Sequence, residues 1–283
     1  MGTLATYLSF VRFSHSVFAL PFAFTGALLA WRVAPFSWTQ VAWIAACMVS
    51  ARSAAMGFNR LVDARFDALN PRTAMRELPR GALTPRQALV FVVAAAAAFV
   101  FCSWRLNPVC GWLSPVALAI VGWYSLAKRV TTYTQFFLGL AMAVAPVGGW
   151  LAAGGARAAE PWWLARAIGL WVGGFDILYA CQDVDFDRAH GLHSIPARYG
   201  VSRAIHLSRL LHVGTIAAMA MVGVTADLLP VYFVGVVVVA VLLWYEQSLV
   251  ADNDLSQVKR AFDLNGYVGL VYFMATALAL YLG

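Results

Sequence analysis

The sequence predicts an all-α membrane protein in which about nine helices cross the bilayer. Of its 283 residues, 62% are hydrophobic and only 12% are charged, and apolar segments recur from end to end. Soluble domains typically carry about 25% charged residues. Most of this protein's surface must therefore face lipid, and we expect a single transmembrane domain over residues 1–283.

Each expected span is an apolar segment close to the roughly 20 residues that a helix needs to cross the hydrocarbon core. The spans are expected at approximately 14–31, 40–58, 87–104, 111–127, 134–153, 162–180, 207–225, 229–248 and 265–282. The first follows Arg12, as the apolar part of a signal peptide would. Because similar segments continue to the end of the chain, we interpret it as a span.

The basic residues indicate the orientation of the chain in the membrane. Of the 20 Lys and Arg residues, only four lie in or near the loops after spans one, three and five: Arg32, Arg105, Arg157 and Arg166. The other 16 lie at the N-terminus, at the inner ends of spans or in the even-numbered loops. Since cytoplasmic loops carry the excess of Lys and Arg, we expect those loops and the N-terminus in the cytoplasm and the C-terminus outside. The net charge of +7 is thereby explained without nucleic acid.

A first acidic cluster follows the second span and reads Asn59-Arg-Leu-Val-Asp63-Ala-Arg-Phe-Asp67. Asn59, Asp63 and Asp67 recur every four residues, so they share one face of a helix. Like charges at this spacing repel and weaken a helix, and they persist most easily where a cation neutralises them. Mg²⁺ prefers oxygen ligands and typically bridges one or two carboxylates to substrate phosphates, so we expect this face to bind it.

A second acidic cluster follows the sixth span and reads Asp183-Val-Asp-Phe-Asp187. Asp183 and Asp187 are again four residues apart, and Asp176 lies seven residues before Asp183, so all three are expected on one helix face. This face is the second candidate Mg²⁺ site.

Similar loops follow the two clusters, which indicates an internal repeat. Each loop is basic and ends in an apolar residue, a proline, an arginine and a glycine, closing at Gly81 and Gly200. Thr84 and Ser202 then stand where helix N-caps are expected. We expect two pseudo-repeat halves, about 1–130 and 131–283.

Basic residues near the clusters suit a phosphate ligand, because a guanidinium donates paired hydrogen bonds to phosphate oxygens. The best placed are Arg72, Arg76, Lys128 and Arg198. Two carboxylate faces, Mg²⁺ and these cations together indicate a diphosphate site.

These segments resemble the UbiA superfamily of membrane prenyltransferases over nearly the whole chain. The resemblance is carried by Asn59-x-x-x-Asp63-x-x-x-Asp67, by Asp176…Asp183-x-x-x-Asp187 and by Tyr124-Ser-Leu-Ala-Lys128-Arg129. It is strongest with the 4-hydroxybenzoate polyprenyltransferase branch, which includes members of the futalosine menaquinone pathway. At one position the chain departs from the family: many members have Asp directly after the first Asn, where this chain has Arg60.

The resemblance implies a ring of helices around a central cavity, in a bacterial cytoplasmic (inner) membrane. It implies a Mg²⁺-dependent transferase that moves a polyprenyl group from polyprenyl diphosphate to an aromatic acid. The expected acceptor is 4-hydroxybenzoate, in ubiquinone or menaquinone biosynthesis, and the alternative acceptor is 1,4-dihydroxy-6-naphthoate. No obligate protein partner is expected.

The same resemblance implies roles for individual residues. Two Mg²⁺ ions would lie at Asn59, Asp63 and Asp67 and at Asp183 and Asp187, and the four cations would bind diphosphate. Tyr124 would stabilise an allylic cation through its ring face, Asp176 would accept the ring proton, and Arg12 would pair with the acceptor's carboxylate.

Two other classes of membrane protein also place acids in or beside spans. In transporters, acids tend towards broken helices at mid-membrane, whereas here they gather at one side beside basic loops. The CDP-alcohol phosphotransferases need Asp-Gly and Ala-Arg elements within the acidic run, and these elements are missing here.

Overall fold

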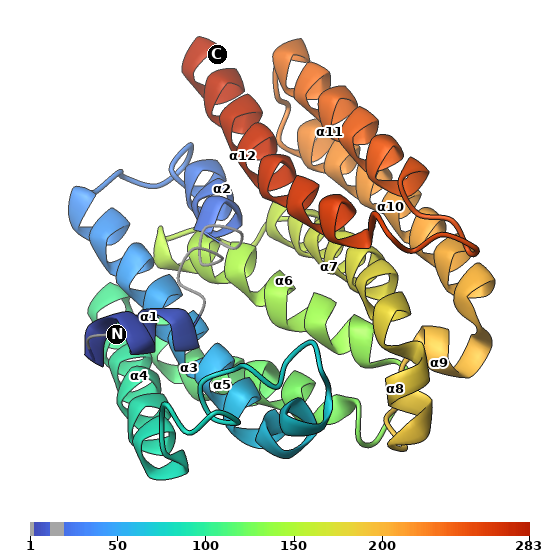
Figure 1. Ribbon diagram of the computed structural model, residues 1–283. Helices are drawn as coiled ribbons and strands as arrows, with labels where there is room; N and C mark the ends of the chain where they lie inside the picture. The colour runs from blue at the N-terminus through green and yellow to red at the C-terminus, as the bar shows by residue number, and fades with distance from the viewer. Residues whose placement is uncertain (1–2, 12–19) are drawn as a thin grey trace. The chain divides into compact units, whose positions relative to one another are not determined.

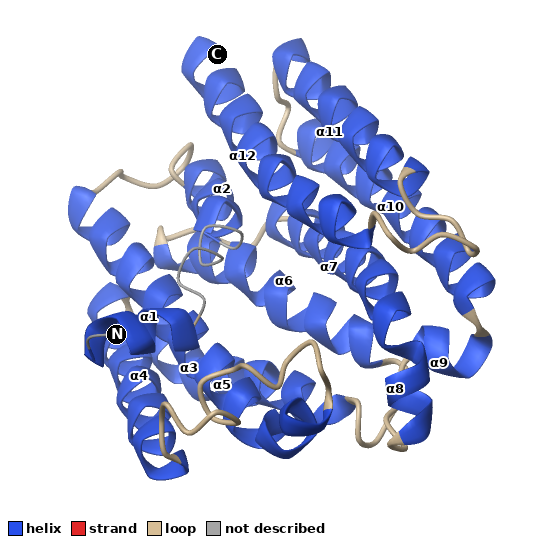
Figure 2. Cartoon of the chain, viewed as in Figure 1, coloured by secondary structure: helices blue, strands red, loops and turns tan. Residues whose placement is uncertain are grey.

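A computed structural model describes residues 3–11 and 20–283, and within these ranges it is helical, without β-strands (Figure 2). The helices, coloured along the chain in Figure 1, are α1 (Thr3–Phe10), α2 (Leu20–Ala30), α3 (Trp38–Leu69), α4 (Pro85–Leu106), α5 (Pro108–Ala127), α6 (Thr134–Ala152), α7 (Glu160–Ala180), η2 (Cys181–Asp183), α8 (Val184–Ala189), α9 (Ile195–Tyr199), α10 (Val201–Thr225), α11 (Pro230–Ser248) and α12 (Val258–Leu282).

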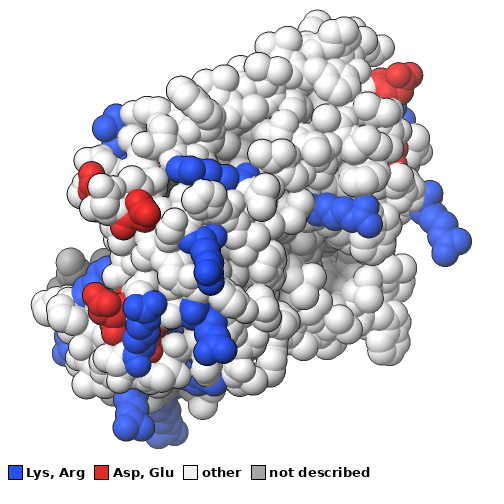
Figure 3. Space-filling model, turned by 90° about the vertical axis from the view of Figure 1, so that its right-hand side faces the viewer, with Lys and Arg blue, Asp and Glu red and all other residues white. Residues whose placement is uncertain are grey.

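The expectation of a multi-span helical membrane protein is confirmed. Eight described segments are long and apolar enough to cross a membrane, and the shorter apolar helix α2 covers part of the first expected span. Large apolar side chains lie exposed along these helices, among them Val90, Trp112 and Trp244. The face in Figure 3 is accordingly uncharged over most of its area. Such a surface is stable in lipid because each exposed apolar group meets an apolar solvent.

The chain divides into two compact units. Among the described residues, the first unit contains 3–11 and 38–126, and the second contains 20–37 and 127–283. The division near residue 126 lies close to the boundary between the expected halves, but α2 belongs to the second unit although it precedes α3 in sequence.

In the first unit, α3 packs along α4, and α1 lies against both helices. Phe10 is fully buried in a cluster with Leu83 and Ala88, and the Tyr7 ring stacks on Phe91 with 5.3 Å between ring centroids. The loop between α3 and α4 therefore has an apolar anchor at its end, in Leu83.

The two expected helix caps have different outcomes. Thr84 caps α4 in a capping box with Gln87, as expected. The expectation for Ser202 is wrong, because α10 begins at Val201, two residues earlier than a cap at Ser202 implies, and its N-cap is Gly200. Gly200 has φ +88°, a conformation that glycine adopts without strain and serine does not.

In the second unit, α7 packs between α6 and α10, and α2 packs against α6 and α12. Small residues allow the backbones to approach closely, which is common between membrane helices. A side-chain carbon at Gly149 would lie 1.9 Å from the Ala23 carbonyl oxygen, and one at Gly26 would lie 2.1 Å from that of Pro146. Glycine is therefore required on both sides of the α2–α6 interface.

We expect Gly149→Val to destabilise the protein by roughly 3 kcal/mol or more, because overpacking against rigid backbone forces the helices apart. The measurement is the apparent Tm in detergent. Gly148→Val is the matched control, since a side chain there meets nothing within 4 Å. Equal Tm values for the two variants would contradict this packing.

Candidate active site

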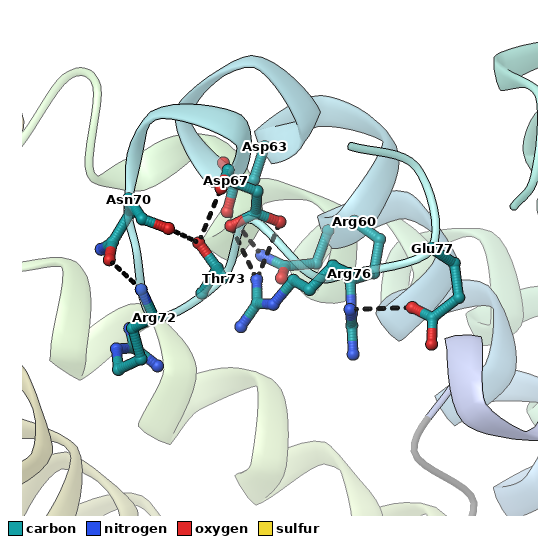
Figure 4. A network of polar contacts seen from close by, with 9 residues as sticks. Arg60, Asp63, Asp67, Asn70, Arg72, Thr73, Arg76 and Glu77 are labelled. Atoms are coloured by element: carbon teal, nitrogen blue, oxygen red, sulfur yellow. Dashed lines mark hydrogen bonds and ion pairs between the residues drawn. The ribbon is translucent and has the colours of Figure 1, made fainter. Parts of the chain in front are cut away.

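The first acidic cluster lies on the last three turns of α3 (Figure 4). Asp63 and Asp67 are buried, with 3% and 6% of their surface exposed. The Asn59 amide donates a hydrogen bond of 3.3 Å to Asp63 Oδ2. The expected arrangement of one amide and two carboxylates along one helix is thus present, with the oxygen atoms that Mg²⁺ prefers.

The loop after α3 folds back onto this acidic end of the helix (Figure 4). Arg76 reaches both carboxylate oxygens of Asp67 from one guanidinium nitrogen, each at 2.8 Å. Thr73 Oγ1 donates to the Asp67 backbone oxygen at 3.0 Å, and Asn70 Oδ1 accepts from the Arg72 backbone amide at 3.0 Å. The loop is therefore held in a defined conformation that leaves the Arg72 side chain exposed.

Arg76 and Asp67 neutralise each other in this structure, although the sequence suggests Arg76 for diphosphate and Asp67 for metal. The two assignments are chemically compatible, because a guanidinium can pair with a carboxylate or with phosphate oxygens. A cation at Asp67 would release Arg76 for a phosphate.

The second acidic cluster spans a break in helical geometry. The sequence predicts Asp176, Asp183 and Asp187 on one continuous helix, but α7 ends at Ala180 and a 3₁₀ turn separates it from α8. A 3₁₀ turn winds more tightly than an α-helix, so Asp183 and Asp187 are rotated from the expected line. Asp176 nevertheless interacts electrostatically with both of them and with Lys128.

Polar contacts fix the loop that carries Arg198. Ser194 Oγ donates to Asp187 Oδ2 at 2.8 Å and accepts from the Ala197 amide, which caps α9. The His193 amide donates to the Lys128 backbone oxygen at 2.7 Å. The structure thereby brings Lys128 and Asp187 to one loop layer of the second unit, while the Arg198 side chain is exposed at the end of α9.

Two further assigned residues are Tyr124 and Arg12. Tyr124 is half-buried in the last turn of α5. Arg12 lies outside the described residues.

Each cluster offers few ligands of its own. Within the described residues, no group of three or more His, Cys, Asp or Glu side chains is arranged to hold a metal ion. Two carboxylates with an amide nevertheless fit Mg²⁺, which retains waters and completes its coordination with substrate phosphates.

Arg52 is a functional candidate that the sequence analysis did not single out. It lies within the spanning part of α3, seven residues before Asn59 and hence on the same face about 10 Å deeper along the axis. Its Nε is buried and has no hydrogen-bond partner among the described residues. A cationic side chain at such a depth is costly and usually functional.

We expect Arg76→Met to lower the stability by about 1–3 kcal/mol in EDTA, because it leaves the Asp67 carboxylate without its partner. Added Mg²⁺ should raise the apparent Tm of the variant more than that of the wild type, since Asp67 is then available to another cation. Arg80→Met, an exposed change in the same loop, is the control. An equal Mg²⁺ effect on all three proteins would contradict the Arg76–Asp67 pairing.

Comparison with known proteins identifies relatives of the whole chain. The model of the UbiA prenyltransferase family matches residues 19–277. The 4-hydroxybenzoate octaprenyltransferase of Tolumonas auensis is 32% identical over 228 residues, which are 81% of this chain and 79% of that protein. The enzyme of the same name from Edwardsiella ictaluri is 33% identical over 230 residues, 81% of this chain and 79% of that protein.

Solved structures of UbiA homologs share the fold of this chain. A UbiA homolog from Aeropyrum pernix K1 superposes with a TM-score of 0.86 at 34% identity, covering 94% of this chain and 98% of that one. A UbiA homolog from Archaeoglobus fulgidus bound to GPP and Mg²⁺ shares the fold, with a TM-score of 0.71 at 19% identity, over 96% and 99% of the two chains.

Proposed function

Because this chain belongs to the UbiA prenyltransferase family, we propose that it transfers a polyprenyl group from polyprenyl diphosphate to 4-hydroxybenzoate in respiratory quinone biosynthesis. One observation carries the proposal. Two buried carboxylates, Asp63 and Asp67, lie at the end of a transmembrane helix, and Arg76 from the loop after α3 pairs with Asp67. Relatives named 4-hydroxybenzoate octaprenyltransferase support the acceptor.

The metal and diphosphate would be bound at the ends of the spans. Asn59, Asp63 and Asp67 would hold one Mg²⁺, and Asp183 and Asp187 a second; the ions would neutralise diphosphate charge when bound. Arg72, Arg76, Lys128 and Arg198 would donate hydrogen bonds to phosphate oxygens. Positive charge placed there in advance stabilises the departing diphosphate. A homolog structure that binds GPP and Mg²⁺ supports this arrangement.

The reaction breaks the bond between the allylic carbon and the diphosphate oxygen, and the electron pair leaves with diphosphate. The aromatic face of Tyr124 would stabilise the resulting cation. A ring carbon of the acceptor then forms the new carbon–carbon bond, and the ring proton passes to the Asp176 carboxylate. Lys128 interacts electrostatically with Asp176.

We propose that Arg52 binds the carboxylate of the acceptor. Arg12, the candidate from the sequence, is the alternative. Arg52 lies deeper in the membrane than Asn59, where an aromatic ring is soluble and a carboxylate needs a cation. Because 1,4-dihydroxy-6-naphthoate also carries a carboxylate, the same residue would serve either acceptor. The site would face the cytoplasm of a bacterium.

Purified protein in nanodiscs, supplied with polyprenyl diphosphate and Mg²⁺, should form prenylated 4-hydroxybenzoate detectable by mass spectrometry and should lose this activity in EDTA. Product with 1,4-dihydroxy-6-naphthoate alone would move the assignment to that acceptor. Folded protein that neither forms product nor releases diphosphate would refute the proposal.

We expect Asp63→Ala and Asp183→Ala to lower turnover by roughly 100-fold or more while the protein stays folded, because each change removes a ligand that would hold the Mg²⁺ whose charge stabilises the departing diphosphate. Asp252→Ala, which removes an exposed acid, should keep wild-type turnover. Full activity in Asp63→Ala would exclude the first cluster from the reaction.

Arg52→Leu should raise the KM for the acceptor about tenfold or more and leave the KM for polyprenyl diphosphate nearly unchanged, because it removes a charged hydrogen bond to the carboxylate alone. Arg12→Leu, measured in parallel, discriminates between the two assignments: a larger acceptor effect there would favour Arg12.

A further inference from the structure

A buried ion pair joins the loop after α3 to the helix at Arg60. Arg60 Nη1 lies 3.1 Å from Glu77 Oε2, and the two side chains are only 5% and 6% exposed. Ser9 Oγ, from α1, donates a hydrogen bond of 2.5 Å to Glu77 Oε1. Both carboxylate oxygens of Glu77 are thus engaged, one from α3 and one from α1.

The position of this pair along α3 relates it to the candidate metal face. Arg60, Asp63 and Asp67 fall at i, i+3 and i+7, so they share one side of the helix. Two consecutive loop residues contact this side of the helix: Arg76 pairs with Asp67, and Glu77 pairs with Arg60 (Figure 4). The attachment points are about 10 Å apart along the axis, with Asp63 between them.

Such a pair adds little to the free energy of folding, because the cost of desolvating two charges offsets most of their attraction. Its geometric effect is larger: shifting the loop by one residue would place Arg76 or Leu78 against Arg60 and break the buried Arg60–Glu77 contact. The pair therefore selects one register of the loop over its neighbours. An acid at position 60 would instead face Glu77 and repel it.

We propose that Arg60, Glu77 and Ser9 form a positioning triad that sets the register of the loop at residues 70–83. Through that register, Arg72 lies exposed for the diphosphate and Arg76 lies against Asp67. Arg60 and Glu77 act as positioning residues and do not ligate the metal, so the first site works with Asn59, Asp63 and Asp67 alone. This inference rests on the proposed function for the diphosphate and on the loop contacts for the register.

The test compares Arg60→Met, Glu77→Gln and the double variant with the wild type, in detergent. Arg65→Met is the matched control, because it removes an exposed arginine from the same helix. Three quantities are measured: the apparent Tm, the rate of tryptic cleavage after Arg76 and Arg80, and the affinity for inorganic pyrophosphate with Mg²⁺ by calorimetry.

Each single variant should lower the Tm, because one buried charge loses its partner. The double variant should recover the Tm, because neither charge remains. All three should nevertheless cleave at least about fivefold faster in the loop and bind pyrophosphate at least about fivefold more weakly, since the register is no longer set. This difference between Tm and binding separates positioning from a purely structural role.

Two results would overturn the triad: wild-type cleavage and pyrophosphate affinity in Arg60→Met, or recovery of all three quantities in the double variant. Ser9→Ala should accelerate cleavage less than Glu77→Gln, and an equal or larger effect would also contradict it. If the wild type binds no pyrophosphate, the proposed function is refuted. The cleavage rates alone then test whether the triad sets the register of the loop.

Discussion

The need of buried carboxylates for positive charge governs the first unit of this protein. Asp63 and Asp67 lie at the end of a transmembrane helix with almost no exposure to solvent, where an uncompensated charge is costly. Arg76 supplies that charge to Asp67, and in doing so it pulls the loop back over α3. The conformation of the loop is thus a consequence of the acids, and so is the exposure of Arg72.

The second unit meets the same need with a different construction. Asp187 accepts a hydrogen bond from the Ser194 hydroxyl, which also caps α9. Lys128, in the segment that follows α5, interacts electrostatically with Asp176. The two loops look alike in sequence, yet the first contains the ion pairs of Arg76 and Glu77, and the second contains the Ser194 cap and the His193–Lys128 backbone hydrogen bond.

Sequence predicted the fold and the acidic clusters because both depend on local pattern. It did not predict every helix boundary: the spacing of the first cluster correctly continues α3 to Asp67, but α7 ends at Ala180, before the second cluster. The 3₁₀ turn at Cys181–Asp183 and the positive φ of the cap at Gly200 are local backbone features that periodicity does not report. Arg52 was counted as an orientation charge, since only burial distinguishes it.

The pairing of Arg60 with Glu77 also limits how related sequences can change. Replacing either residue alone breaks the buried ion pair and leaves one of its two charges inside the protein, so the two positions do not vary independently. A lineage that placed an acid at position 60 would have to change position 77 first or at the same time. The effect of a substitution at one site therefore depends on the residue at the other, which is epistasis arising from a single buried contact 3.1 Å long.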